Sequence, residues 1–311
     1  MIIRRNLRIN VLLTIYEQIQ QNDTTNRSAA QNSLNDKFTQ TSSLFTSLWH
    51  LVVLTADYVL IHANQKASKH RPTEADLNVS TKIISNSIIQ DLKKNTRFEE
   101  SVKLHKSHLM FDTYFVREIF IKLVESDFYN NYIAEKENSI ESDRAIIEYL
   151  LNEIILKDNV ASSFIAEKYI NYEMDVDMVQ TWTEKVVNNP KNFAFNRIIS
   201  AEKLEFSHDL LDTYYDKKDT IFELIEPKLI GWDADRVAIL DLIILHLGIS
   251  EMLYFPSIPL RVTINEYIDL AKGYSTPQSG QFVNGLLDNV KKDLEAQNKI
   301  HKNDFIKKER K

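Results

Sequence analysis

Residues 258–290 read IPLRVTINEYIDLAKGYSTPQSGQFVNGLLDNV, and this stretch decides the fold class. Thr263 and Glu266 have the Thr-x-x-Glu spacing of a capping box, which predicts a helix that begins there and ends at Gly273. Thr276 and Pro277 predict the cap and the first residue of the next helix, because proline is favoured at the first helical position. Two short helices with sharply defined ends are therefore expected in this stretch.

Glycine is almost absent from the rest of the chain. The five glycines are at positions 231, 248, 273, 280 and 285, so the first 230 residues contain none. A phosphate-binding loop, a dinucleotide fingerprint and an EF-hand each need glycine in a tight loop, so all three are excluded there. Tight β-hairpins are also excluded, since the single Asn-Gly pair, at 284–285, lies in an apolar helical pattern. The sequence predicts an all-α fold.

The N-terminal residues predict one amphipathic helix. Its apolar residues recur at helical spacing, at Ile9, Leu12, Leu13, Tyr16 and Ile19. Arg4, Arg5 and Arg8 lie in the first turns, where positive charge opposes the helix dipole. Three arginines at an unfavourable position indicate a use outside the fold.

Helical patterns also fill the middle of the chain. They cover residues 44–65, 74–95, 99–133, 141–157, 159–170 and 174–188, and Pro190 ends the run. The polar stretch 22–43 predicts a loop or a weak helix that frays into a linker. The WDADR sequence at 232–236 predicts a further helix start with Asp233 as its N-cap.

Composition and charge limit the classes of function. The 311 residues include no cysteine, which excludes disulfides and thiolate metal sites and agrees with a cytoplasmic location. The apolar stretches 48–61 and 237–249 are too short and too polar to span a membrane. Residues 1–21 carry a net charge of +2 and residues 291–311 one of +4, which leaves −12 between them out of a total of −6. Basic ends on an acidic body favour phosphate contacts, although charged termini also serve solubility alone.

Several blocks of sequence resemble one family. The run Arg4-Arg5-Asn6-Leu7-Arg8 through Tyr16 is similar to the arginine-led first helix of the bacterial NusB family. The pieces INE at 264–266, LAK at 270–272 and FVNG at 282–285 look like the closing segment of that family, and residues 232–254 resemble its Trp-Asp…Asp-Arg helix. Blocks in the right order and at the right spacing are far more specific than one short motif.

The resemblance implies a domain plan. Helix 1, in residues 1–24, and a core at 200–295 would form a NusB-like helical bundle. Residues 25–199 would be a large inserted helical region, as in longer bacterial members, and residues 296–311 a basic tail.

The resemblance also implies a function. Family members pair with the small-subunit ribosomal protein NusE, and the pair binds boxA RNA of ribosomal RNA operons within the RNA polymerase antitermination complex, which prevents premature termination. It implies no enzyme, no cofactor and no small-molecule substrate. The alternative is an all-helical protein-binding scaffold in ribosome assembly that never contacts RNA.

Site residues follow from matching positions. Those expected to bind RNA are Arg4, Arg5, Arg8, Lys272, Gln278 and Phe282, and those expected to face the ribosomal partner are Tyr16 and Asp241. For two of these residues a purely structural role remains an alternative to RNA binding. Phe282 fits a core position in its apolar pattern, and Lys272 compensates the dipole at the end of its helix.

One helix face departs from the family pattern. Leu242 and His246, four residues apart, stand where compact members commonly carry arginine. We expect the inserted helices to cover this face, because an exposed leucine would leave apolar surface in contact with water.

A metal site is the remaining alternative. His105 and His108 are three residues apart and would share a helical face. No third ligand stands at metal-site spacing, and Lys103 and Lys106 crowd the pair with positive charge, so we predict no metal and no catalytic residue.

Overall fold

A computed structural model describes residues 4–23, 25–135, 139–169, 171–229 and 238–303. All regular secondary structure in these ranges is helical and none is strand, which confirms the predicted all-α class. The chain divides into two compact units. The terminal unit contains residues 3–36 and 200–311, and the central unit contains residues 37–199.

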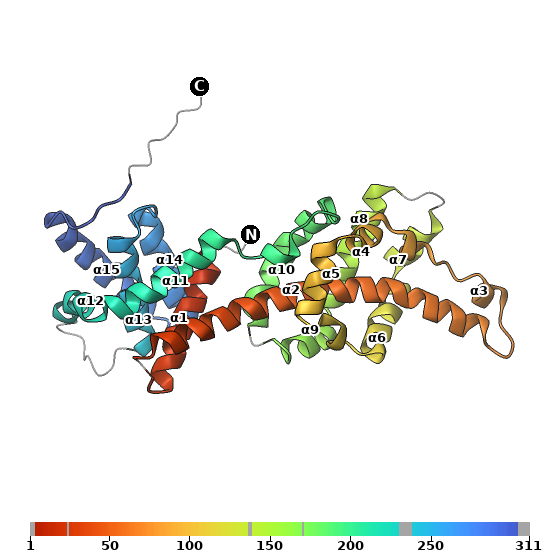
Figure 1. Cartoon of the computed structure of the whole chain (residues 1–311), viewed down its shortest axis with the longest axis horizontal. Helices are drawn as coiled ribbons and strands as arrows, with labels where there is room; N and C mark the ends of the chain where they lie inside the picture. Colours follow the sequence, from red (N-terminus) through yellow and green to blue (C-terminus); the bar gives the residue numbers. More distant parts are fainter. Residues whose placement is uncertain (1–3, 24, 136–138, 170, 230–237, 304–311) are drawn as a thin grey trace, which may run out of the picture. The chain divides into compact units, whose positions relative to one another are not determined.

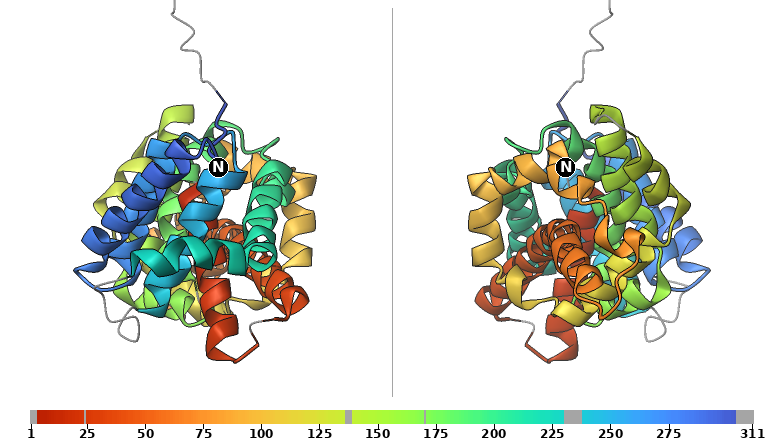
Figure 2. Two further views of the ribbon diagram at one scale, coloured as in Figure 1. Left: turned by 90° about the vertical axis from the view of Figure 1, so that its left-hand side faces the viewer. Right: turned by 90° about the vertical axis from the view of Figure 1, so that its right-hand side faces the viewer.

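The terminal unit joins the two ends of the chain. Its helices are α1 (Arg4–Gln20), α11 (Ala201–Asp216), α12 (Lys218–Ile225), the 3₁₀ turn η5 (Glu226–Lys228), α13 (Ile239–Tyr254), α14 (Leu260–Tyr274) and α15 (Ser279–Ala296). Helix α13 packs against each of α1, α11, α12, α14 and α15, so it is the central helix of the unit (Figures 1 and 2). It is buried almost without interruption from Ile243 to Met252, because its sequence is apolar on every side.

The central unit is a series of shorter helices around the long helix α2 (Arg27–Ala67), which starts in the terminal unit (Figure 1). The α-helices are α3 (Glu74–Leu77), α4 (Ser87–Lys93), α5 (Thr96–Leu104), α6 (Thr113–Val124), α7 (Asp127–Ala134), α8 (Ile140–Tyr149), α9 (Asn159–Ala166) and α10 (Tyr172–Asn188). Three 3₁₀ turns, η1 (Lys82–Ser85), η2 (Ser107–Leu109) and η4 (Phe195–Arg197), and a π-helical segment, η3 (Leu150–Leu156), complete it.

Side-chain caps break the long helices that periodicity predicted. The side chains of Asn86, Asn95, Asp112, Ser126, Ser139 and Asp158 each accept a hydrogen bond from a backbone N–H of the following first turn. Such residues satisfy N–H groups that a helix start leaves without a partner. The predicted helices at 74–95 and 99–133 are therefore wrong as single helices, because capping residues inside each pattern start new ones.

The prediction of a loop or a weak, fraying helix at 22–43 is also wrong. Helix α2 begins at Arg27, and Ala30 and Leu34, one turn apart, are completely buried. Arg27 forms an ion pair of 2.6 Å with Asp212 of α11. The burial of these two apolar residues and this ion pair stabilise the first turns of α2 as helix. The polar composition of the stretch gives no sign of either contact.

Helix α2 is long and apolar enough, by length and composition, to cross a membrane. However, 72% of its most apolar window is buried inside the protein. Apolar residues that are already covered by the chain's own helices are typical of a core helix.

Two helix starts in the closing segment differ from prediction. Helix α14 begins at Leu260, so Thr263 lies inside it, and its hydroxyl donates to Glu251 instead of capping the helix. Helix α15 begins at Ser279, whose hydroxyl accepts from the backbone N–H of Thr276 (3.1 Å). The predicted N-cap Asp233 lies outside the described residues.

The carboxylate of Asp175 in the central unit is buried, and no cation of the described residues pairs with it. Asp175 on α10 is 2% exposed and accepts a hydrogen bond of 2.7 Å from the Thr41 hydroxyl, while its other oxygen has no hydrogen-bond partner among the described residues. Burial raises the pKa of Asp175 to about 6 from its ordinary 3.8. The folded state therefore holds the proton to a higher pH than the unfolded chain, and the central unit loses stability as pH rises from 3.8 to about 6.

Replacing Asp175 by asparagine should remove this loss, because the amide keeps an acceptor for Thr41 and carries no charge. At pH 8 we expect the free energy of unfolding of the central unit to rise by about 2–3 kcal/mol, and at pH 4 to change little. Urea titrations followed by tryptophan fluorescence measure this, since Trp49 and Trp182 are both buried in the unit. Asp177→Asn, on the same helix, is the control; equal effects at both pH values would contradict the account.

Candidate functional site

A buried ion pair holds α1 in the terminal unit. Arg8 is 2% exposed, and its Nε and Nη2 donate to the two carboxylate oxygens of Glu251 on α13 at 2.7 and 2.8 Å. The hydroxyls of Thr263 and Tyr267 on α14 donate to the same carboxylate at 2.8 and 3.2 Å. Burial alone would lower the pKa of Arg8, but the hydrogen bond to Glu251 and the surrounding charge raise it, so the guanidinium stays charged.

This placement contradicts the prediction that Arg8 binds RNA. Both carboxylate oxygens of Glu251 and the surrounding helices occupy its guanidinium, which leaves no face for a phosphate. The sequence showed an arginine against the helix dipole but could not show the carboxylate 243 residues later that compensates it.

The other two arginines of α1 lie at the surface. Arg4 and Arg5 each have 42% of their side chain exposed, and they pair with Glu202 (3.2 Å) and Asp269 (3.3 Å). Lys272, 61% exposed, shares Asp269 at 3.5 Å. Exposed ion pairs of this kind contribute about 0–1 kcal/mol each, so a phosphate can replace the carboxylate at little cost.

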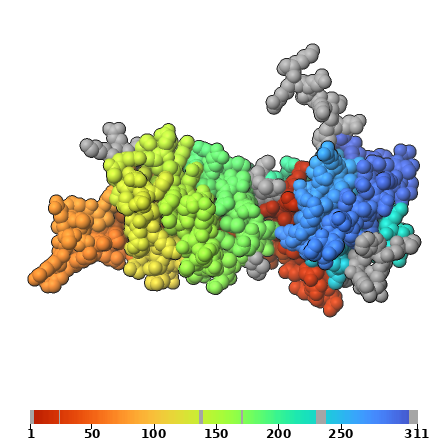
Figure 3. Space-filling model, turned by 180° about the vertical axis from the view of Figure 1, so that it is seen from behind, coloured from red at the N-terminus to blue at the C-terminus, as the bar shows by residue number. Residues whose placement is uncertain are grey.

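Of these cations, Lys272 also contacts α15. The side chain of Lys272 lies against Gly280, where an added Cβ would stand 2.8 Å from Lys272 Cγ. A separate groove of about 400 Å³ is lined by Lys228, Gln278, Gln281, Phe282, Gly285, Leu286 and Asn289. Gln278 is exposed, whereas Phe282 is only 9% exposed and presents part of its ring to the groove. Figure 3 shows α1 (red) beside α14 (blue) on one face of this unit.

Three amides line this groove beside one aromatic ring. Gln278, Gln281 and Asn289 supply donors and acceptors for the edge of a base, and no carboxylate lines the groove among the residues that the structure describes. Sequence reasoning identified Gln278 and Phe282 but missed Gln281 and Asn289. Their spacing on one face of α15 was the signal available.

The two residues expected to face a partner differ in position. Tyr16 on α1 is half-buried, and its role toward a partner stays a prediction. Asp241 is 5% exposed and accepts a hydrogen bond of 2.7 Å from Ser279, which ties the first turns of α13 and α15 together. The expectation that Asp241 faces a partner is therefore corrected, because its carboxylate is turned into the unit.

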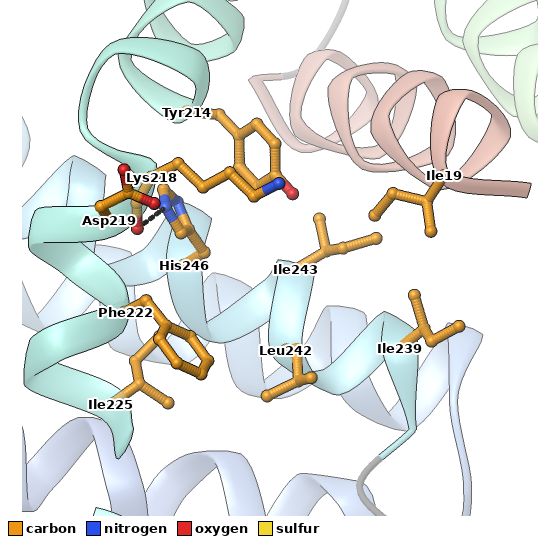
Figure 4. Close-up of a pocket in the computed structure, with 10 residues that line it drawn as sticks. All are labelled: Ile19, Tyr214, Lys218, Asp219, Phe222, Ile225, Ile239, Leu242, Ile243 and His246. Atoms are coloured by element: carbon orange, nitrogen blue, oxygen red, sulfur yellow. Dashed lines mark hydrogen bonds between the residues drawn. The ribbon is translucent and has the colours of Figure 1, made fainter. Parts of the chain in front are cut away.

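Next to Asp241, a second groove is mainly apolar. It has a volume of about 420 Å³ and is lined by Ile19, Tyr214, Lys218, Asp219, Phe222, Ile225, Ile239, Leu242, Ile243 and His246 (Figure 4). Phe222 and Ile239 are 44% and 42% exposed. All ten residues, Leu242 among them, belong to the terminal unit. That the inserted helices cover Leu242 stays a prediction.

His246 closes one end of this apolar groove. Its Nε2 lies 3.3 Å from the carbonyl oxygen of Lys218, and burial lowers its pKa to about 4 (Figure 4). The ring is therefore neutral at neutral pH, and Lys218 and Asp219 at the rim are the charged groups among the described lining residues.

The described part of the basic tail has a structural use. Lys302 Nζ donates to the carbonyl oxygens of Glu251 and Phe255, each at 2.8 Å, at the end of α13. Such contacts compensate the carbonyl groups that a helix end leaves unpaired. Residues 304–311 lie outside the described part of the chain.

No group of three metal-ligating side chains occurs among the described residues. His105 is the C-cap of α5 and His108 lies in η2, with the left-handed Lys106 between them. The two imidazoles therefore do not share one helical face.

Comparison with known proteins gives the family. The NusB family profile matches residues 164–292. The transcription antitermination protein NusB of Bacillus pumilus (strain SAFR-032) is 36% identical over 121 residues, which are 38% of this chain and 92% of that protein. The proteins of the same name from Carboxydothermus hydrogenoformans and Bacillus subtilis (strain 168) are 35% and 37% identical, over 40% and 33% of this chain and 81% and 80% of their own lengths. No solved structure matches.

The chain therefore belongs to the NusB family, which confirms the resemblance seen in the sequence. The profile match starts at residue 164, within α9, and ends within α15, so it includes α10 of the central unit, α11–α14 and most of α15. It does not include α1, which joins these helices through Arg8 and Glu251.

Removal of Arg8 should destabilise the terminal unit severely. Arg8→Ala leaves the Glu251 carboxylate buried and without its cation, so we expect a loss of about 3–5 kcal/mol in the free energy of unfolding. Arg4→Ala, which breaks only an exposed pair on the same helix, should cost at most about 1 kcal/mol. Urea denaturation followed by circular dichroism distinguishes the two, and equal losses would show that the buried pair does not hold α1.

Proposed function

We propose that this chain is an RNA-binding transcription antitermination factor, and that it binds boxA-type RNA of ribosomal RNA operons together with ribosomal protein NusE. Its relatives carry the name of transcription antitermination protein. We assign it no catalytic role, and we place it in the cytoplasm, where its RNA target is made.

The observation that carries the proposal is a set of exposed cations and an amide-lined groove on the terminal unit. Arg5 and Lys272 share Asp269, Lys272 lies against Gly280 of α15, and the groove runs along α15 past Gln278. Cations there serve the phosphates, while amides and the edge of Phe282 serve unstacked bases, which is how single-stranded RNA is commonly bound. The proposed RNA-binding residues are thus Arg4, Arg5, Lys272, Gln278 and Phe282.

NusE is the proposed partner at the apolar groove. Tyr16 lies one turn before Ile19 on α1, and Ile19 lines the groove with Leu242. Half-exposed apolar side chains around a hollow, with charged groups at its rim, form the usual centre of a protein interface. We propose that residues 1–24 and 200–295 act as the binding module for RNA and NusE, and that the inserted helices of residues 25–199 extend it.

RNA affinity should depend on the surface cations. Replacing Arg4, Arg5 and Lys272 by alanine should weaken binding of a boxA-type RNA and reduce the slope of log affinity against log salt by about 0.7 for each phosphate that these side chains neutralise. The control variant removes three exposed cations elsewhere, Lys66, Lys69 and Lys157, and should leave the slope unchanged. Filter binding across a salt series measures both; identical slopes would refute the assignment.

Partner binding should depend on the apolar groove. Leu242→Asp places a charge in the groove and should reduce NusE affinity at least tenfold, about 1.4 kcal/mol, without change to the RNA-surface residues. Val262→Asp, a 44% exposed apolar residue on α14, is the matched control. Calorimetric titration with NusE tests this. If NusE binds both variants normally, the groove is not its binding site. If the wild-type chain also binds no RNA, the antitermination proposal fails and the protein-binding scaffold is favoured.

A further inference from the structure

The central unit contains a small pocket between α5 and the η4 segment. It has a volume of about 170 Å³ and is lined by Arg97 at the start of α5 and by Ala194, Asn196 and Arg197 of the η4 segment. Arg97, Asn196 and Arg197 are all exposed at its rim. Two arginines and an asparagine therefore line one small hollow.

The frame of this pocket is rigid. The Asn95 side chain accepts from the Phe98 N–H, and its amide donates to the carbonyl oxygens of Pro190 and Phe193 at 2.8 and 3.0 Å. The rings of Phe98 and Phe195 lie 4.6 Å apart, and both are buried. One asparagine and one aromatic pair thus fix the η4 segment on α5, which brings Arg97 and Arg197 together from positions 100 residues apart.

The charge at this pocket is not neutralised. Within the described ranges, neither Arg97 nor Arg197 forms an ion pair, although Arg97 Nη1 donates to the Asn192 carbonyl at 3.2 Å. Glu99, the nearest carboxylate along α5, pairs instead with Lys103 at 2.6 Å. No acidic side chain of the described residues lines the pocket. Like charges held together without a counter-charge favour an anion, and the planar fork of arginine suits the oxygens of a phosphate.

We propose that this pocket binds a phosphate group, and that the group is a phosphodiester of the RNA that the chain binds. The RNA source rests on the function proposed above. A volume of about 170 Å³ is that of about six water molecules, at about 30 Å³ each, which accommodates a phosphate but not a whole nucleotide. Exposed arginines hold a free ion only weakly, whereas a strand already bound at another site presents its phosphates at high effective concentration.

The pocket would then add an RNA contact in which Arg97 lies outside the matched residues 164–292 and Arg197 lies inside them. The test uses the full chain, a short boxA-type RNA and a longer RNA that contains it. Arg97→Ala combined with Arg197→Ala should weaken binding of the longer RNA several-fold and reduce its salt slope by about 0.7 for each phosphate that the pocket neutralises. The matched control, Arg71→Ala with Arg117→Ala, removes two exposed arginines from other elements of the same unit and should change neither.

A second arm separates RNA from free phosphate. Inorganic phosphate is titrated while the Nε–H resonances of Arg97 and Arg197 are followed by nuclear magnetic resonance; weak, saturable shifts at both residues are expected. No shift, together with an unchanged salt slope in the double variant, overturns the site. Shifts with an unchanged RNA slope overturn RNA as the occupant and identify free phosphate.

Failure of this inference is distinct from failure of the proposed function. If the wild-type chain binds neither RNA, the proposed function fails and the RNA occupant fails with it, while the phosphate titration still decides whether the pocket takes a phosphate. If RNA binding depends on Arg4, Arg5 and Lys272 but not on Arg97 and Arg197, only the present inference is overturned.

Discussion

The bidentate pair between Arg8 and Glu251 is the interaction on which the terminal unit depends. Taking both charges out of water is costly, and only near-complete hydrogen bonding repays that cost. Thr263 and Tyr267 supply the remaining donors, so one carboxylate connects α1, α13 and α14. Lys302 binds the carbonyl oxygen of the same Glu251, which brings the tail into the arrangement as well.

The proposed surface for RNA follows from this constraint. With Arg8 fixed inside, the preceding turn of α1 places Arg4 and Arg5 at the rim of the unit, beside α11 and α14. Asp269 then links Arg5 to Lys272, and Lys272 reaches the start of α15 because Gly280 has no side chain to obstruct it. The most buried arginine thus determines where the exposed ones stand.

Sequence patterns predicted the fold class and the family because both rest on local features. Scarce glycine and helical periodicity gave the all-α class, and the blocks at 264–266, 270–272 and 282–285 gave the family. The predicted helix boundaries were wrong where a single capping side chain starts a new helix, as at Asn95 and Asp112. Hydrophobic periodicity carries no information about such caps. The start of α2 was mispredicted because the sequence around Leu34 is polar, whereas the tertiary fold buries Leu34 itself.

The sequence could predict site residues only where it could predict that their side chains are exposed. Arg8 and Asp241 are polar residues whose partners, Glu251 and Ser279, lie far away in sequence or on another helix, so no local pattern showed that they are buried. The pocket at Arg97 and Arg197 was not foreseen for the same reason, since Asn95 and Phe98 join segments about 100 residues apart.

Native-state hydrogen exchange tests the central claim most directly. If the buried pair makes α1 part of one cooperative unit with α13, the backbone amides of Leu7, Val11 and Leu12 should exchange with the same opening free energy as those of Ile244 and Leu247. Exchange of the α1 amides through local fraying, with an opening free energy several kcal/mol lower than that of α13, would contradict the account.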